Sequence, residues 1–452
     1  MSAVIGVDVG SSAIKAVLFD SNDRCPIRSE RRELASRVPN LSPECFEEDP
    51  VSIRDATFSI ITALAQFAKE HSHPIEAIGF TGQMHGGMLV DSALEPLTNF
   101  VTWQDKRAGE IAEDGSSYAD ELRDFMRSDP TGVSIHTGFL IATLYWLIQQ
   151  KAMPPNAARI LGIYDWLASL LAGRAVTDIS SAAAWGMYDP VELTWRMDLL
   201  TAAEIPEQLL PDVAEPGANL GTMNAALAEH LGLDASVRIH ASIGDTQAAY
   251  LGSGCTEDEI LLNFGTGSQS MWETDLPFAT QGTDIRYLRN GQYLACAPTL
   301  AGGEAYRIVA EFFQEVVREF SGLPISREQA IAVMDRLAAP SETKGIMFDP
   351  IFSGSKFRDD SERASIENLT RENFHPGPLV LALIEGMIEE VAKPYFRRKG
   401  EMIHAGLVGA GSAMCYNTAL REAAERRFAR PLRLAPYPDE AAIGAALLCL
   451  GR

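Results

Sequence analysis

The residues best suited to chemistry lie between positions 243 and 268. Asp245 follows a glycine and starts a short alanine-rich helical pattern, and the apolar strand 260–264 then ends in the turn 265–268, which reads Gly-Thr-Gly-Ser. A carboxylate can accept a hydroxyl proton, and a glycine-rich turn can hold phosphate oxygens with its N–H groups. The combination favours phosphoryl transfer. A plain helix N-cap is the alternative for Asp245 taken alone.

A second turn of the same kind lies near the N-terminus. The β-rich run 4–9 leads into Gly10, Ser11 and Ser12, and the apolar run 13–20 follows. This pattern predicts a β-hairpin whose tip suits phosphate, although an ordinary hairpin tip is the alternative. Two copies of the same strand–turn–strand motif suggest two domains of related fold, each presenting a hairpin tip to the same ligand.

Alternating strands and helices must position these turns. Strand patterns occupy 75–81, 88–90, 237–242, 294–300 and 403–407. Helical patterns occupy 55–70, 140–151, 163–172, 222–233, 305–320, 378–393, 414–428 and 440–450. The alternation predicts an α/β protein. The strand 403–407 also runs into a glycine-rich turn, 408–412, and then a helix, an arrangement that favours an anion or nucleotide.

Two more segments place polar residues at strand ends. Gln83, Met84 and His85 lie between glycines after the strand 75–81, and the missing side chains leave space for a ligand. Further along, 101–107 joins Trp103 to a dense polar group containing Asp105. Both segments could line a ligand pocket. The alternatives are a satisfied core histidine in the first and a buried tryptophan with a solvated helix cap in the second.

Length and composition limit the protein class. A chain of 452 residues is long enough for two domains, and its net charge of −23 argues against nucleic-acid or anionic-membrane partners. The six cysteines are dispersed without zinc spacing, no signal peptide is apparent, and no apolar run reaches the roughly 18 residues of a membrane span. We expect a reduced, cytoplasmic protein, and a homodimer is compatible with the sequence.

Four segments in order resemble the FGGY carbohydrate kinases. They are 8–15 (DVGSSAIK), 244–249 (GDTQAA), 263–268 (NFGTGS) and 408–412 (VGAGS), and the resemblance covers nearly the whole chain. It implies an α/β fold with two RNase H-like domains, of the actin and hexokinase type, around an ATP cleft. The expected boundaries are 1–252 and 253–452.

The resemblance also implies roles for individual residues. Asp245 would be the catalytic base, and Asp8 would hold Mg²⁺. The sugar pocket would contain Gln83, Met84, His85, Trp103, Asp105 and Asp245. The ATP-binding residues would be Gly10, Ser11, Ser12, Lys15, Gly265, Thr266, Gly267, Gly302, Gly411 and Ser412. The implied substrates are ATP and a small-molecule ketose.

A few residues within the family pattern indicate which sugar accepts the phosphoryl group. GQMHG at 82–86 resembles the xylulokinase and sedoheptulokinase branch, since glycerol kinases have an Arg-Glu pair at Met84-His85, and TWQDKR at 102–107 leans towards sedoheptulokinase. The expected product is sedoheptulose 7-phosphate; xylulokinase, another ketose kinase and a non-catalytic sugar or nucleotide sensor are the alternatives. Ala410 and Cys415 depart from the family's adenosine motif, and the charged loop 352–365 is looser than usual.

Overall fold

The chain forms two compact units. The computed structural model describes residues 2–111, 115–125, 135–265, 267–354, 361–398 and 404–451. The first unit comprises Met1–Gly252, Arg286–Tyr293 and Asp439–Arg452, and the second comprises Ser253–Ile285 and Leu294–Pro438. In the described part of the chain, no helix combines the length and apolarity that a membrane crossing requires.

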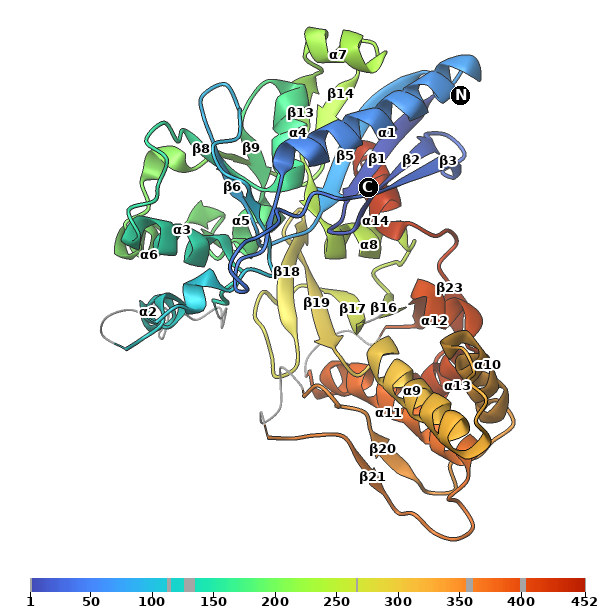
Figure 1. Cartoon of the computed structure of the whole chain (residues 1–452). Coiled ribbons are helices and arrows are strands. Elements are labelled where there is room, and N and C mark those ends of the chain that lie inside the picture. Colours follow the sequence, from blue (N-terminus) through green and yellow to red (C-terminus); the bar gives the residue numbers. More distant parts are fainter. Residues whose placement is uncertain are drawn as a thin grey trace. The chain divides into compact units, whose positions relative to one another are not determined.

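A seven-stranded sheet forms the centre of the first unit (Figure 1). Its order is β13-β14-β5-β1-β2-β3, and β15 also pairs with β5. The strands are β1 (Ala3–Val9), β2 (Ala13–Asp20), β3 (Pro26–Glu33), β5 (Ile75–Gly82), β13 (Asn219–Thr222), β14 (Arg238–His240) and β15 (Ile243–Gly244). The first three are antiparallel neighbours, whereas β5 runs parallel to β1 and to β14.

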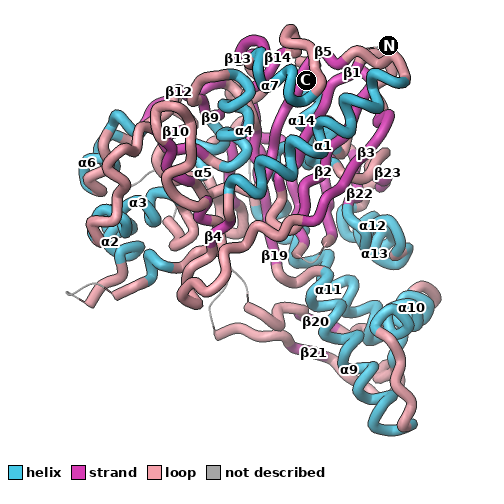
Figure 2. Tube along the Cα trace, turned by 45° about the horizontal axis from the view of Figure 1, so that its top comes forward, coloured by secondary structure: helices cyan, strands magenta, loops and turns pink. Residues whose placement is uncertain are grey.

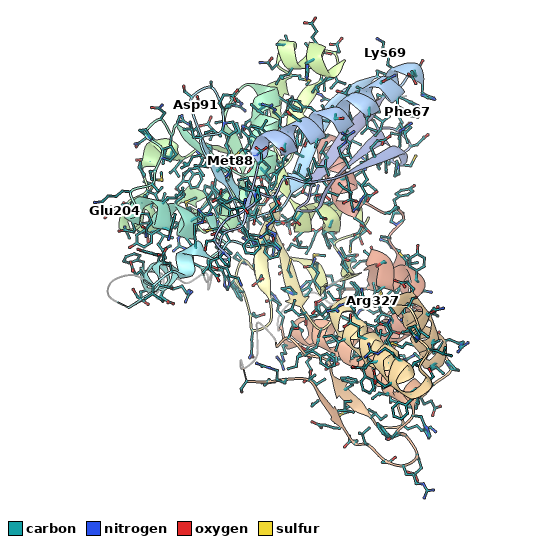
Figure 3. The ribbon with its side chains drawn as sticks, viewed as in Figure 1. Phe67, Lys69, Met88, Asp91, Glu204 and Arg327 are labelled. Atoms are coloured by element: carbon teal, nitrogen blue, oxygen red, sulfur yellow. The ribbon has the colours of Figure 1, made fainter. Side chains whose placement is uncertain are left out.

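Three helices pack against one face of this sheet. They are α1 (Pro50–Glu70), α4 (Ile163–Ala172) and α7 (Ala225–Leu231). Figure 2 shows α1 running along the strands, and its apolar residues share a core with alternate residues of β1 such as Ile5 and Val7. Asp49 caps α1 by accepting bonds from two backbone N–H groups. Towards the other end, near Phe67 and Lys69 (Figure 3), the Arg28 guanidinium lies 4.6 Å from the Phe67 ring centroid.

Helices α8 (Asp245–Gly252) and α14 (Glu440–Cys449) cover the opposite face. Small residues make this possible: a Cβ on Gly6 would lie 2.0 Å from a backbone oxygen of α14, and one on Gly79 would lie 2.4 Å from another. The two helices also touch backbone to backbone, since a Cβ on Gly252 would meet the Glu440 carbonyl at 1.7 Å. The glycines therefore allow the C-terminal helix to pack in the first unit.

Smaller elements complete the first unit. The strands are β4 (Glu47–Glu48), β6 (Met88–Val90), β7 (Phe100–Val101), β8 (Arg159–Leu161), β9 (Val176–Asp178), β10 (Tyr188–Asp189), β11 (Thr194–Trp195) and β12 (Asp212–Ala214). The helices are η1 (Arg107–Gly109), α2 (Tyr118–Phe125), α3 (Leu140–Gln149), α5 (Ile179–Ala184), α6 (Met197–Ala202) and η2 (Glu207–Leu209). Short two-stranded ladders, such as β4 with β7 and β6 with β8, hold this region together.

The second unit has its own six-stranded sheet in the order β18-β19-β17-β16-β22-β23. The strands are β16 (Glu259–Phe264), β17 (Ser268–Thr274), β18 (Asp284–Arg289), β19 (Gln292–Thr299), β22 (Gly406–Ala410) and β23 (Leu432–Leu434). A ladder of β20 (Met347–Asp349) and β21 (Ser365–Glu367) and five helices complete it: α9 (Gly303–Ser321), α10 (Arg327–Ala338), α11 (Pro376–Arg397), α12 (Gly411–Tyr416) and α13 (Thr418–Phe428). Strand β16 pairs antiparallel with β17 and parallel with β22, as β1 does with β2 and β5.

The α/β class and the repeated hairpin are therefore confirmed, but some predicted elements differ. The strand expected at 403–407 is β22 at 406–410, so part of the predicted glycine-rich turn is strand. The single helix expected at 414–428 is two helices, because Asn417 ends α12 and caps α13. Helix α10, whose first residue Arg327 is labelled in Figure 3, went unpredicted although Ser326 and Gln329 form a capping box. Positions 355–360 of the charged loop lie outside the described residues.

Candidate active site

Strand register brings the first group of candidate residues together. Asp8 on β1 lies opposite Lys15 on β2 and opposite Thr81 on β5. Directly paired residues point to the same face of a sheet, so the three form a row across three strands. Ile243 on β15 pairs with Thr81, and α8 begins two residues later with Asp245. The fold thus assembles a site from residues separated by more than two hundred positions.

The two aspartates of this group influence each other. Burial and, to a smaller degree, the negative charge of Asp245 raise the pKa of Asp8 to about 7, although the positive charge of Lys15 lowers it. Lys15 also forms an ion pair, 3.1 Å long, with Asp439 at the start of α14. Sequence reasoning missed Asp439. Its position before a small-residue helix was visible, but only the packing of α14 in the first unit places it beside Lys15.

This pair of carboxylates fits a magnesium ion. Mg²⁺ prefers hard oxygen ligands, binds through one or two carboxylates and keeps several waters. Asp8 and Asp245 supply oxygens whose charges repel each other, and the Thr81 hydroxyl is buried without a hydrogen-bond partner among the described residues. Those residues contain no cluster of three or more candidate ligand side chains, so the chain itself would provide only part of the coordination.

Asp245 itself is held by contacts before and after it. The Thr246 hydroxyl donates to Asp245 Oδ1 over 3.1 Å, and the Gly244 N–H donates to Ser180 Oγ over 2.9 Å. Ser180 in turn hydrogen-bonds Asp178, the N-cap of α5. Burial raises the pKa of Asp245, whereas the Arg286 charge and the Thr246 hydrogen bond lower it. The base candidate is therefore partly buried, oriented and balanced by a nearby cation.

The predicted sugar-pocket residues after β5 lie next to this site. A Cβ on Gly244 would approach Met84 Sδ to 2.3 Å, so Met84 lies directly against the residue before Asp245. Gln83 donates to Glu48 Oε2 over 2.8 Å, and its own Oε1 is buried with no partner in the described part of the chain. Glu48 was not anticipated, since its neighbours in sequence form an ordinary acidic run ahead of α1.

His85 occupies the left-handed region, with φ of 72°. Its Nδ1 lies 2.8 Å from the Ala184 carbonyl oxygen, and its ring stacks on Phe139 with centroids 4.6 Å apart. The ring is partly exposed. A histidine held on two sides in this way can present a fixed edge to a ligand.

Trp103 and Asp105 have different environments. The Trp103 side chain is 49% exposed, as a flat pocket wall requires. Asp105 is fully buried: it accepts hydrogen bonds from the Phe46 N–H over 2.7 Å and from Arg107 Nε and Nη2 over 2.8 and 2.9 Å. Both of its oxygens are engaged inside the protein. The geometry therefore gives Asp105 a structural contact in place of the sugar contact that the sequence predicted.

The N-terminal hairpin tip is accessible. Ser11 and Ser12 are exposed at the turn between β1 and β2, and Ser12 also accepts a backbone bond from Leu34 through its carbonyl. A Cβ on Gly10 would approach only the Ala13 carbonyl, at 3.1 Å. The tip is thus a short turn near Asp8 that exposes two serine side chains, Ser11 and Ser12. Exposed hydroxyls and backbone N–H groups are what a phosphate contact requires.

The second unit brings most of its predicted nucleotide residues together. Gly265 donates to the Gly267 carbonyl over 3.0 Å and accepts from the Gly303 N–H over 3.2 Å. Gly411, with φ of 83°, lies against the end of β16, where a Cβ would meet the Phe264 carbonyl at 2.4 Å. Thr266 lies outside the described residues, and Ser412 is exposed in the first turn of α12.

Gly302 has a packing reason for being glycine. A Cβ there would lie 1.9 Å from Ser268 Oγ, so the start of α9 could not approach β17 with any larger residue. Asn417, the amide near the predicted adenosine motif, donates to Asp335 over 2.8 Å and accepts from the Leu420 N–H over 2.9 Å. Its side chain is thus used in capping α13, whereas Cys415 is exposed.

The buried Glu48 gives a pH-dependent prediction. Burial raises its pKa from 4.5 to about 7, against the lowering effects of the Gln83 hydrogen bond and the Arg37 charge. A raised folded-state pKa means that the stabilisation is complete below pH 4.5 and is lost as the pH rises through 7. Glu48→Gln should therefore gain stability relative to the natural protein between pH 5 and 8, by about 2–3 kcal/mol.

Urea unfolding of both proteins at several pH values measures this difference. Glu33→Gln, at an exposed strand position of β3, is the matched control and should show no such trend. A stability difference for Glu48→Gln that does not change between pH 5 and 8 would contradict the assignment.

Comparison with known proteins identifies the family of the chain. The model of the FGGY family of carbohydrate kinases, N-terminal domain, matches residues 3–252. Sedoheptulokinase from Mus musculus is 26% identical, and the match covers 99% of this chain and 97% of that protein. Two solved Lactobacillus acidophilus structures, a gluconate kinase and a ligand-bound xylulose kinase, are each 25% identical with a TM-score of 0.82; both cover 99% of this chain, and 88% and 89% of theirs.

These likenesses extend over the whole chain, and the matched N-terminal region contains Asp8, Lys15 and Asp245. The two repeated hairpins and the two sheets have the arrangement expected of the two-domain sugar-kinase fold. The chain belongs to the FGGY family of carbohydrate kinases and is a phosphotransferase enzyme.

Proposed function

We propose that this enzyme transfers the γ-phosphoryl group of ATP to the terminal primary hydroxyl of a ketose, and that the ketose is sedoheptulose. The observation that carries the proposal is the partly buried Asp245 at the start of α8, next to Asp8 and Met84. A proton acceptor beside a pocket wall and a second carboxylate is what an alcohol phosphotransferase needs.

In the proposed reaction, Asp245 removes the proton from the acceptor hydroxyl while the oxygen of that hydroxyl attacks the γ-phosphorus of ATP. The bond between the γ-phosphorus and the β,γ-bridging oxygen breaks, and its electron pair leaves with ADP. Phosphoryl transfer depends mainly on alignment and charge neutralisation. The contacts of Thr246 and Ser180 serve the alignment, because they fix the backbone and carboxylate on both sides of the base.

Magnesium, when bound, would neutralise phosphate charge, and Asp8 would hold it directly or through water. Gly10, Ser11, Ser12 and Lys15 are the proposed phosphate contacts of the first unit. In the second unit, the proposed nucleotide-binding residues are Gly265, Thr266, Gly267, Gly302, Gly411 and Ser412. Of these, Gly302 and Gly411 act by allowing close backbone approach.

Four of the predicted sugar-pocket residues remain as proposed sugar contacts, because both carboxylate oxygens of Asp105 are engaged inside the protein. Gln83 offers a buried carbonyl oxygen, His85 a fixed ring, Met84 an apolar contact and Trp103 a flat exposed wall. Such a mixture suits a polyhydroxylated chain with an apolar C–H face. Similarity over the full length to the mouse protein named sedoheptulokinase supports sedoheptulose, and the xylulose kinase structure keeps D-xylulose as the second candidate.

A coupled ADP-release assay with sedoheptulose, D-xylulose, D-ribulose, D-gluconate and glycerol tests the substrate. We expect the highest kcat/KM with sedoheptulose. A higher value for any other acceptor would overturn the specific assignment while leaving sugar kinase activity in place. Ketose binding by calorimetry without any ADP release would instead favour a non-catalytic sensor.

A further inference from the structure

Strand β18 (Asp284–Arg289) places a residue beside Asp245 that neither the motifs nor their spacing predicted. Residues 286–293 form part of the first unit, although the strands that carry them pair in the second sheet. Tyr287 anchors this tip: its carbonyl accepts from Gln247 Nε2 over 3.1 Å, and its hydroxyl donates to Glu215 Oε2 over 2.8 Å. Tyr293 donates to the Pro190 carbonyl over 3.2 Å.

The hydrogen bonds of Tyr287 and Tyr293 hold Arg286 close to Asp245. Gln247 lies two residues after Asp245 on α8, and Tyr287 directly follows Arg286, so the Gln247 bond fixes the spacing between the tip and α8. Arg286 Nη1 lies 3.3 Å from Thr246 Oγ1 and 3.2 Å from Met84 Sδ. Its charge is close enough to Asp245 to lower the pKa of that carboxyl.

These two contacts involve only the Nη1 atom of the Arg286 guanidinium. Nη1 contacts a hydroxyl at 3.3 Å and a thioether, which is a weak acceptor, at 3.2 Å, and no carboxylate of the described residues forms an ion pair with Arg286. Other arginines of the first unit are neutralised directly, as Arg107 is by Asp105 and Glu47. Arg286 is half-buried, so its side chain is partly shielded from solvent beside the base.

An arginine in this position matches a phosphoryl group. Guanidinium presents its donors in a planar fork that binds phosphate oxygens in pairs, and it stays charged at every working pH. The acceptor oxygen that loses its proton to Asp245 is the atom to which the phosphoryl group becomes attached. A cation touching Thr246 and Met84 is therefore close to that new bond.

We propose that Arg286 is a catalytic residue that binds the transferring phosphoryl group from the acceptor side and stabilises the charge that develops on its equatorial oxygens. The proposal rests on the proposed function, because it requires the acceptor hydroxyl to lie at Asp245. It adds a residue of β18 to the base and the N-terminal phosphate turn of the first unit.

Arg286→Met tests this role, since it keeps the length of the side chain and removes its charge. We expect kcat to fall by about 10²–10³, the usual effect of losing one preorganised donor at developing charge. The KM values for ketose and ATP should stay within about threefold, because the contact strengthens only in the transition state. Arg286→Lys should recover part of the rate, since it restores charge without the fork.

Rescue of kcat by added guanidinium ion distinguishes a catalytic role of Arg286 from a purely structural one. Added at millimolar concentration to Arg286→Ala, it should raise kcat at least about fivefold, and it should not help Arg286→Met, whose side chain fills the space. Arg289→Met, on the same strand, is the control and should match the natural protein. Circular dichroism melting of each variant verifies that the tip has not unfolded.

Each outcome bears on one claim. Normal kcat in Arg286→Met, or a raised ketose KM with kcat unchanged, overturns the catalytic role. Loss of kcat without rescue by guanidinium in Arg286→Ala also overturns it. Absence of ketose-dependent ADP release in the natural protein would instead overturn the proposed function, so the two failures are distinguishable.

Discussion

Asp245→Asn should lower kcat by about 10²–10⁴ with the fold intact, the effect expected from losing a general base. Asparagine keeps the shape of the side chain and can still accept from Thr246, but it cannot take the hydroxyl proton. Because the variant removes a partly buried charge that repels Asp8, its stability at neutral pH should equal or exceed that of the natural protein. The KM for ATP should change little.

Steady-state kinetics and thermal melting check both halves of this expectation. Asp234→Asn, in an exposed turn, serves as the matched control and should leave kcat unchanged. Turnover of Asp245→Asn within about tenfold of the natural enzyme would remove Asp245 from the role of base. A melting temperature well below that of the natural protein would show that the buried carboxylate is needed for folding.

Arg107→Met should destabilise the first unit by about 3–5 kcal/mol, the usual result of breaking a buried ion pair from one side. Arg107 is 8% exposed and binds Asp105 through Nε and Nη2 and Glu47 through Nη2. Its guanidinium also lies 5.3 Å from the Trp146 ring centroid. Removing it leaves two buried or half-buried carboxylates facing each other without a cation.

A double-mutant cycle separates this effect from lost packing. Asp105→Leu alone should also be strongly destabilising, because Arg107 then retains only Glu47. The double variant Arg107→Met with Asp105→Leu should be less destabilised than the sum of the two single variants, since neither partner is then left alone. Urea midpoints give the free energies. Additive losses, or a loss below about 1 kcal/mol for Arg107→Met, would contradict a coupled buried pair.

Local patterns allowed the hairpins and most helices to be predicted from the sequence. The β1–β2 and β16–β17 turns follow from short-range alternation and glycine placement, and the structure has both. Helices such as α3, α4 and α14 begin within a residue of the expected positions, because their apolar spacing is regular. Asn417 shows the limit of the method: a cap inside an apolar pattern divides one predicted helix into two.

The site could be predicted only where the chain supplied a motif. Asp245, Met84 and the glycine turns belong to recognisable segments, whereas Asp439 and Arg286 are single residues in ordinary surroundings. They reach the site because α14 and the β18–β19 tip pack in the first unit, which is a long-range consequence of glycine contacts and of the Tyr287 anchors.

Asp105 shows the converse error. The polar run 102–107 suggested a ligand contact, but charge alone does not reveal which side of a strand end a carboxylate will face. Arg107, two residues later, folds back onto it and takes both oxygens. In sequence the pair looks like an exposed polar cap, and only the burial of Arg107 against Trp146 distinguishes the two arrangements.

The most direct measurement of the central claim is the ³¹P spectrum of the product formed from ATP and sedoheptulose. The account predicts a new phosphomonoester signal, split into a triplet by the two protons of a terminal CH₂ group, that appears with the natural enzyme and not with Asp245→Asn. A doublet from a secondary carbon, or inorganic phosphate and ADP without any phosphomonoester signal, would contradict transfer to a terminal hydroxyl.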